Sequence, residues 1–115
     1  MLFRSLHGRG LDVLTYDYRG IGGSRPANLR GLQAGWLEWG ELDFEGALRW
    51  LEAHCPDQPV LAVGHSAGGL LLGLAESNRR IVRSLTVGAC LRQSPRKEQK
   101  KLWHAFTQRV SPARR

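Results

Sequence analysis

Few cysteines and no long apolar run are present in this sequence. Cys55 and Cys90 are the only cysteines among 115 residues and form no Cys-x-x-Cys pair, which excludes a zinc knuckle and a disulfide-dense secreted scaffold. No apolar stretch approaches the roughly 18 residues that span a bilayer, and the first residues open neither a signal peptide nor a clear transit peptide. We therefore expect reduced thiols in a soluble, cytoplasmic protein.

Excess positive charge is absent from most of the chain. Residues 1–91 carry nine Arg and nine Asp or Glu, whereas residues 92–115 carry eight Lys or Arg against Glu98 alone, so the net charge of +7 belongs to a tail. A helix in this tail would form a basic amphipathic surface, of the kind that lies on acidic membranes or nucleic acid. A solvated tail and the product of a disrupted reading frame are the alternatives. The apolar stripe of such a helix would be Leu102, Trp103, Phe106 and Val110.

Strand and helix signals alternate along residues 1–91. Three strand candidates joined by helical crossovers predict an α/β fold, with a partial parallel sheet and flanking helices. The continuous apolar run Pro59–Val63 predicts a strand buried on both faces. Three strands are few for such a sheet, so the chain looks incomplete. The expected strands are Leu11–Tyr16, Pro59–Val63 and Ile81–Val87, and the expected helices are Leu2–Leu6, Glu41–His54 and Leu70–Ala75, the last one stopped at Asn78.

The motif Gly-His-Ser-Ala-Gly, residues 64–68, follows an expected strand and precedes an expected helix. A nucleophile elbow needs this strand, sharp turn and helix, because the turn projects a strained serine from the edge of the sheet. Gly64 and Gly68 would leave space where the chain doubles back, and the Ala67 N–H would face a developing oxyanion. Ser66 is therefore the candidate nucleophile.

The glycine-rich turn has two other interpretations, a purely structural connection and a phosphate-binding loop. The segment Gly64–Gly69 could be only a glycine-rich connection between a strand and a helix. A phosphate-binding loop is excluded, because the turn contains neither Gly-Lys-Ser/Thr nor Gly-x-Gly-x-x-Gly. His65 is adjacent to Ser66 and would point away from its hydroxyl, so we expect a packing residue and not a general base.

A second motif, Asp-Tyr-Arg-Gly-Ile-Gly-Gly-Ser, occupies residues 17–24 after the first expected strand. Together with the Gly-His-Ser-Ala-Gly-Gly turn and the stretch Trp36–Gly40, it resembles the α/β-hydrolase family, in its serine-aminopeptidase-like and esterase-like branch. The resemblance covers about Phe3–Ala89. It implies that Asp17–Ser24 is a scaffold beside the active site. The alternative is that this segment is only a tight turn held by an Arg19 salt bridge.

The same resemblance implies a catalytic role for part of the elbow. Ser66 would attack an ester, amide or thioester carbonyl, and the Ala67 N–H would be one oxyanion donor. The family's triad acid and histidine have no matching positions, because they lie after later strands. We expect no metal and no organic cofactor. Glu98 with His104 is the one pair that could be improvised in the tail. Glu76, expected on the elbow helix about two and a half turns from Ser66, is too far away to orient a base there, and His7 and His54 are expected to be surface residues at helix ends.

These observations predict a hydrolase core fragment at residues 1–91 and a basic tail at 92–115, disordered or the remnant of a cap helix. The function predicted first is serine hydrolysis of a small acyl substrate, incomplete in this chain. The alternative is a catalytically inert α/β module, whose open sheet edge pairs with a protein partner and whose tail binds an anionic partner such as nucleic acid or a membrane surface.

Overall fold

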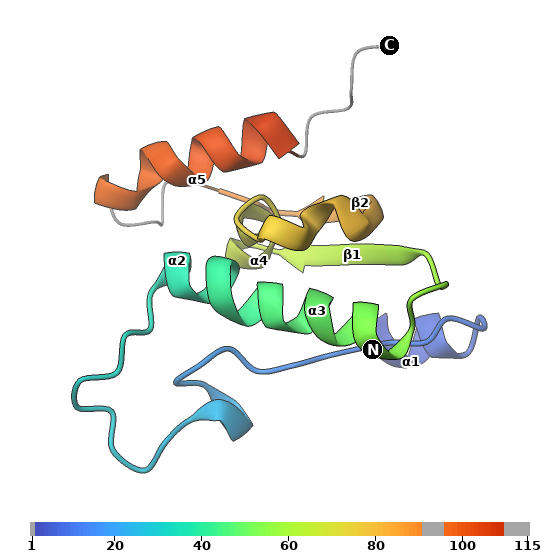
Figure 1. Cartoon of the computed structure of the whole chain (residues 1–115), viewed down its shortest axis with the longest axis horizontal. Coiled ribbons are helices and arrows are strands. Elements are labelled where there is room, and N and C mark those ends of the chain that lie inside the picture. Colours follow the sequence, from blue (N-terminus) through green and yellow to red (C-terminus); the bar gives the residue numbers. More distant parts are fainter. Residues whose placement is uncertain (1, 91–95, 110–115) are drawn as a thin grey trace.

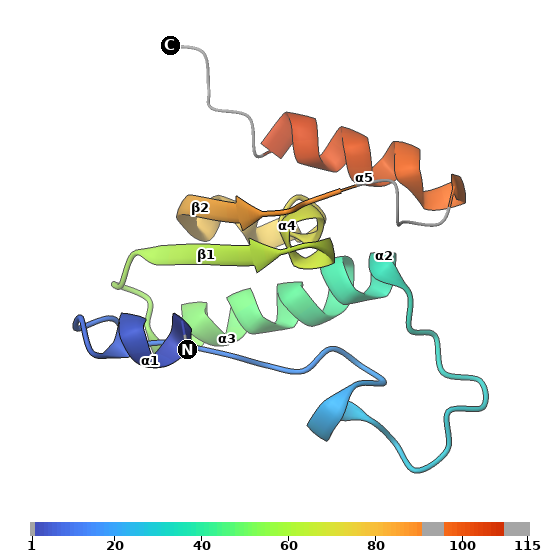
Figure 2. The same cartoon turned by 180° about the vertical axis from the view of Figure 1, so that it is seen from behind.

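A computed structural model describes residues 2–90 and 96–109 (Figure 1). The elements lie in layers, with helix α5 (Arg96–Arg109) at one end of the molecule and the irregular segment 11–35 at the other. Figure 2 shows the same order from behind, with the two strands and helix α4 (Ala67–Leu71) between these ends. Within the described part of the chain, no helix is long and apolar enough to cross a membrane.

The sheet consists of two parallel strands, β1 (Val60–His65) and β2 (Ile81–Val87). They are in register from Val60 opposite Ile81 to His65 opposite Val87, with an irregularity after Val60. The crossover between them is α4 and the 3-10 helix η3 (Glu76–Arg80). The predicted α/β class, a parallel sheet with flanking helices, is confirmed.

The strand predicted at Leu11–Tyr16 is wrong. These residues are irregular, and each of them is exposed. A strand exists only where a neighbour supplies ladder hydrogen bonds, and the single inter-strand pairing among the described residues is β1 with β2. The β-rich composition of this segment is therefore not sufficient to form a strand. Upstream of it lies α1 (Leu2–His7), which agrees with the predicted first helix.

A continuous helical segment runs from Trp36 to His54, through α2 (Trp36–Glu38), a π-helical turn η2 (Trp39–Phe44) and α3 (Glu45–His54). It begins five residues before the predicted start, Glu41, because the Glu38 carboxylate accepts a hydrogen bond from the Gly35 N–H (2.8 Å) and caps the first turn. It ends at Cys55, before Pro56, as predicted.

The elbow helix α4 is shorter than predicted. It ends at Leu71, and Asn78 lies in η3 instead of stopping the helix. The buried Glu45 carboxylate on α3 holds η3 in place by accepting hydrogen bonds from the Ser77 N–H (2.8 Å) and Oγ (2.6 Å). Burial alone would raise the pKa of Glu45, but these bonds and the Arg49 guanidinium together hold it below its usual value.

The core lies between α4, α2 and α5. Leu71 and Leu102 are 1% and 0% exposed, and Trp36 and Trp39 pack against them. Residues 96–109 of the basic tail thus form a docked helix and not a solvated tail. The predicted apolar stripe is divided, because Leu102 is buried while Trp103 is 55% exposed. The Phe106 side chain and Val110 lie outside the described residues.

Candidate active site

Ser66 occupies a strained turn between β1 and α4. Its backbone has φ 54° and ψ −121°, and it is the only non-glycine residue with positive φ in the described chain. Side chains in this region crowd the backbone, so the conformation costs about 1–3 kcal/mol and persists only where the surroundings impose it. Here the Ser66 N–H donates to the carbonyl of Val87 at 2.8 Å, which ties the turn to the end of β2. This is the geometry expected of a nucleophile elbow.

Close backbone contact explains which glycines the turn requires. A Cβ on Gly64 would lie 2.6 Å from both the Cα and the N of Gly69, so no side chain fits there. The steric argument does not hold at Gly68, where a Cβ would lie 3.6 Å from Tyr18 Oη, an ordinary contact distance. The second tight position is Gly69, where a Cβ would lie 2.9 Å from Ala89 Cβ. Sequence reasoning missed Gly69, although the Gly-Gly pair at 68–69 was visible.

The sequence predicts the Ala67 N–H as an oxyanion donor, and this amide directly follows Ser66 at the start of the elbow helix. Ala67 is the first residue of α4, and the amide of a first helical residue has no acceptor within its own helix. The Gly69 N–H is already used, since it donates to the Ser66 carbonyl at 3.1 Å. Ser66, Ala67 and Gly68 are each half-buried, so the turn is shielded without being closed.

A cavity of about 270 Å³ opens beside Ser66. Its walls combine the elbow with aromatic and aliphatic side chains from the segment before the Asp17–Ser24 loop, from η2 and from α4. Among the described residues that line it there is no carboxylate, and the single histidine is His65. The lining residues are Tyr16, Tyr18, Phe44, Val63, Gly64, His65, Ser66, Ala67, Gly68, Leu71 and Leu72.

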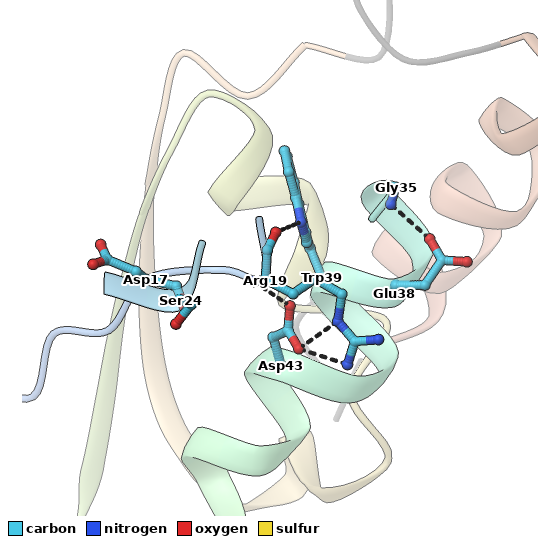
Figure 3. Close-up of polar contacts among 7 residues, drawn as sticks. All are labelled: Asp17, Arg19, Ser24, Gly35, Glu38, Trp39 and Asp43. Carbon is cyan, nitrogen blue, oxygen red and sulfur yellow. Dashed lines mark hydrogen bonds and ion pairs between the residues drawn. The ribbon is translucent and has the colours of Figure 1, made fainter. Parts of the chain in front are cut away.

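The Tyr18 wall of this cavity is held by the Asp17–Ser24 loop, as the scaffold interpretation predicts. The Arg19 guanidinium and N–H both donate to the Asp43 carboxylate at 2.8–2.9 Å. The Trp39 Nε1–H donates to the Arg19 carbonyl at 3.1 Å, and the Trp39 ring stacks on Tyr18 with centroids 5.1 Å apart. Figure 3 shows Asp43 and Trp39 approaching Arg19 from the same helical segment. The loop itself is closed by the Gly23 N–H donating to the Asp17 carboxylate.

Both tyrosines at the cavity remain uncharged. Although Tyr16 is 39% exposed as a residue, desolvation of its phenol raises the pKa of this group, and the neighbouring Tyr18 and Asp43 raise it further. Burial also raises the pKa of Tyr18, despite a hydrogen bond from Tyr16 that lowers it. The two rings meet edge to face with centroids 5.4 Å apart. The two phenols are thus uncharged at physiological pH and are able to donate hydrogen bonds.

Of the four histidines, His65 lines the cavity beside Ser66, and the other three are not among its lining residues. His65 is exposed and lines the cavity, so its expected role as a packing residue is wrong. His7 and His54 are exposed, as predicted, and His54 stacks on Trp50. His104 is on α5, six residues after Glu98, and this spacing puts the two side chains on different faces of the helix.

Neither acidic candidate for the triad, Glu76 or Glu98, lines the cavity beside Ser66. Glu76 belongs to η3, is mostly exposed and forms an ion pair with Arg49 at 3.7 Å. Glu98 turns toward the core, where one carboxylate oxygen is buried. Among the residues described, no group of three or more His, Cys, Asp or Glu could hold a metal ion, and both cysteines are free thiols.

Comparison with known proteins gave one family match. The model described as the alpha/beta hydrolase family matches residues 1–115. It therefore includes residues 92–115, which lie beyond the Phe3–Ala89 span of the resemblance seen in the sequence. No curated protein and no solved structure gave a significant match.

Proposed function

The chain belongs to the alpha/beta hydrolase family, and from this premise we propose that Ser66 is the nucleophile of an acyl hydrolase. The observation that carries the proposal is the strained Ser66 backbone at the edge of a cavity, because such strain is retained where a site needs it. Gly64 and Gly69, packed against one another, impose the turn.

The proposed reaction passes through an acyl-enzyme. The Ser66 oxygen would form a bond to the substrate carbonyl carbon while its proton moves to a base, and the carbonyl oxygen would become an oxyanion facing the Ala67 N–H. Collapse of this intermediate breaks the bond to the leaving group, which takes up the proton. Water then hydrolyses the serine ester and restores the hydroxyl.

The cavity favours an uncharged acyl substrate. Its aromatic and aliphatic walls contain neutral phenols and no carboxylate among the described residues, so an ester, amide or thioester with an apolar acyl group fits best. We propose the serine-aminopeptidase-like or esterase-like branch for the same reason. No organic cofactor or metal enters this chemistry.

In this proposal Ser66 is the nucleophile and the Ala67 N–H is one oxyanion donor. No carboxylate lines the cavity among the described residues, and its one histidine, His65, is adjacent to Ser66 and is not assigned as the base. We therefore propose that the chain alone turns over substrate very slowly unless another polypeptide completes the site. The missing base limits the rate because general base catalysis contributes about 100-fold to 10,000-fold.

An activity-based probe tests the proposal directly. Folded wild type should react with a fluorophosphonate, and Ser66→Ala should lose the label. Ser24→Ala is the matched control, because it removes a serine hydroxyl from the neighbouring loop, where Ser24 Oγ donates to the Asp17 carbonyl. Labelling of this variant should match that of wild type. Circular dichroism establishes that each variant is folded. Absence of labelling in folded wild type would reject an activated serine in this chain.

A catalytically inert module is the second candidate, and one observation favours it. Leu61, Val63, Leu85 and Val87 on the sheet are 48–60% exposed, and each strand has one edge without a neighbouring strand among the described residues. Such a surface suits a protein partner that completes the sheet. Folded wild type without probe reactivity, together with a complex seen by light scattering, would favour this candidate.

A further inference from the structure

Helix α5 has a fixed orientation on the molecule. Leu102 is fully buried against Leu71 and Leu74, and Ala105 packs against the same cluster. Fourteen residues give the helix a length of about 21 Å. Both views show it as the outermost layer beyond the sheet and α4 (Figures 1 and 2). One side of α5 is thus committed to the core, and the opposite side faces outward.

Acidic groups near α5 are turned inward or already paired. Glu98, its single acid, has a buried carboxylate oxygen on the core side. Lys101 forms an ion pair with Glu41 of η2. Of the cations at positions 96–101, Arg96, Lys97 and Lys100 remain exposed and are in no ion pair that joins α5 to the described body of the protein.

Helical geometry gathers these cations on the outward side. At 100° per residue, Arg96 and Lys100 lie about 40° apart, and Lys97 lies about 100° from Arg96. Trp103 falls within about 60° of Lys100 on the same side, and it is 55% exposed. Leu102 and Glu98 lie on the far side of the helix, in agreement with their burial. We call Arg96, Lys97, Lys100 and Trp103 the cationic face.

We propose that the cationic face of α5 binds the surface of an anionic phospholipid bilayer. Residues 1–91 carry equal numbers of Arg and of acidic residues, so the excess positive charge belongs to residues 92–115, and α5 carries five of the eight Lys and Arg there. A planar anionic surface is the complement of three cations in one exposed strip. The ring of Trp103 suits the headgroup region, where an aromatic side chain finds apolar and polar surroundings together.

The shallow shape of the cationic face favours a bilayer over nucleic acid as its partner. Because α5 is docked on the core through Leu102 and Ala105, it presents a shallow strip and not a protruding helix that could enter the major groove. Leu102 and Ala105 on its apolar side are occupied by the core, so among the described side chains of α5 Trp103 is the apolar group that can enter the interface, and attraction is mainly electrostatic. Binding should therefore weaken as salt is raised. This inference does not depend on the reactivity of Ser66.

Vesicle sedimentation with the full chain tests the inference. Wild type should bind vesicles of phosphatidylserine and phosphatidylcholine and should not bind pure phosphatidylcholine. Lys97→Gln/Lys100→Gln should weaken binding roughly thirtyfold, at about fivefold for each cation removed near the surface. The matched control Arg9→Gln/Arg30→Gln removes the same charge from exposed residues outside α5 and should change binding less than about twofold.

Several outcomes would overturn it. Equal binding to neutral vesicles, or no binding to either kind, rejects an anionic bilayer. Equal weakening by the two double variants assigns the attraction to net charge and not to the cationic face. Tighter binding to duplex DNA than to the mixed vesicles, weakened in Lys97→Gln/Lys100→Gln, identifies nucleic acid as the partner. Trp103→Phe should remove the blue shift of tryptophan emission on mixed vesicles, and a shift that persists rejects the placement of this ring.

Discussion

The two faces of the small sheet differ sharply in their surroundings. On one face, α4 comes so close that Gly64 and Gly69 must both lack side chains, and Thr86 lies under the same helix. On the other, Leu61, Val63, Leu85 and Val87 are 48–60% exposed. Alternation along a strand assigns these four residues to the face opposite Gly64. A single pair of strands therefore has one closely packed side and one apolar side without a cover in the described chain.

This difference separates the contacts that form the elbow from the apolar surface that further packing would cover. The strain at Ser66 and the contact between Gly64 and Gly69 all belong to the side where α4 lies. The opposite side supplies Val63 and His65 to the cavity wall and otherwise presents exposed apolar side chains. The elbow can consequently form while a large apolar surface stays accessible, and the two properties can be tested separately.

The largest effect should come from filling the tight side. Gly64→Ala places a methyl group 2.6 Å from the Gly69 backbone, which cannot move away without displacing α4. We expect a loss of at least about 3 kcal/mol in the free energy of unfolding, measured with urea. Gly68→Ala is the control, since its Cβ would meet only Tyr18 Oη at 3.6 Å and should cost less than about 1 kcal/mol. Equal losses in both variants would contradict the asymmetry between these glycines.

Local patterns predicted the elbow and the strands on either side of α4. Ile81–Val87 agrees residue by residue. The Gly-x-Ser-x-Gly spacing located the strained turn at Ser66, because close packing there requires glycine at Gly64, although not at Gly68. The strand expected at Leu11–Tyr16 failed because pairing is not a local property. The same limit applies to the strand predicted at Pro59–Val63, which forms as Val60–His65. Its predicted burial on both faces is wrong, because Leu61 and Val63 are 52% and 48% exposed and an apolar run does not show what covers each face.

Long-range packing decided the rest of the site. The tightness of Gly69 comes from Ala89, twenty residues later in the chain, so the spacing of the motif alone could not assign it. Tyr18 became a cavity wall through Trp39, and the docking of α5 depends on Leu102 reaching Leu71. One signal was available, because an apolar residue at Leu102 within a highly charged segment indicates a helix with a buried side.

Truncating one leucine on each side of the sheet should sharpen the comparison. Leu71→Ala removes a side chain that is 1% exposed and should cost about 2.5 kcal/mol, whereas Leu85→Ala removes one that is 60% exposed and should cost less than about 0.5 kcal/mol. Urea unfolding followed by tryptophan fluorescence gives both values. A cost for Leu85→Ala close to that for Leu71→Ala would mean that the outer face is covered in solution, and concentration-dependent unfolding would then identify a second copy as the cover.

The smallest effect concerns Ser66 itself, where stability and reactivity should change in opposite directions. Glycine adopts positive φ without steric cost, so Ser66→Gly relieves strain that Ser66→Ala retains, while its greater freedom in the unfolded chain offsets part of the gain. We expect Ser66→Gly to be about 1 kcal/mol more stable than Ser66→Ala, although neither variant reacts with a fluorophosphonate. Comparing the two variants cancels the loss of the hydroxyl and isolates the backbone. Equal stability would show that the serine conformation carries no strain, and the argument that links strain at Ser66 to function would lose its physical basis.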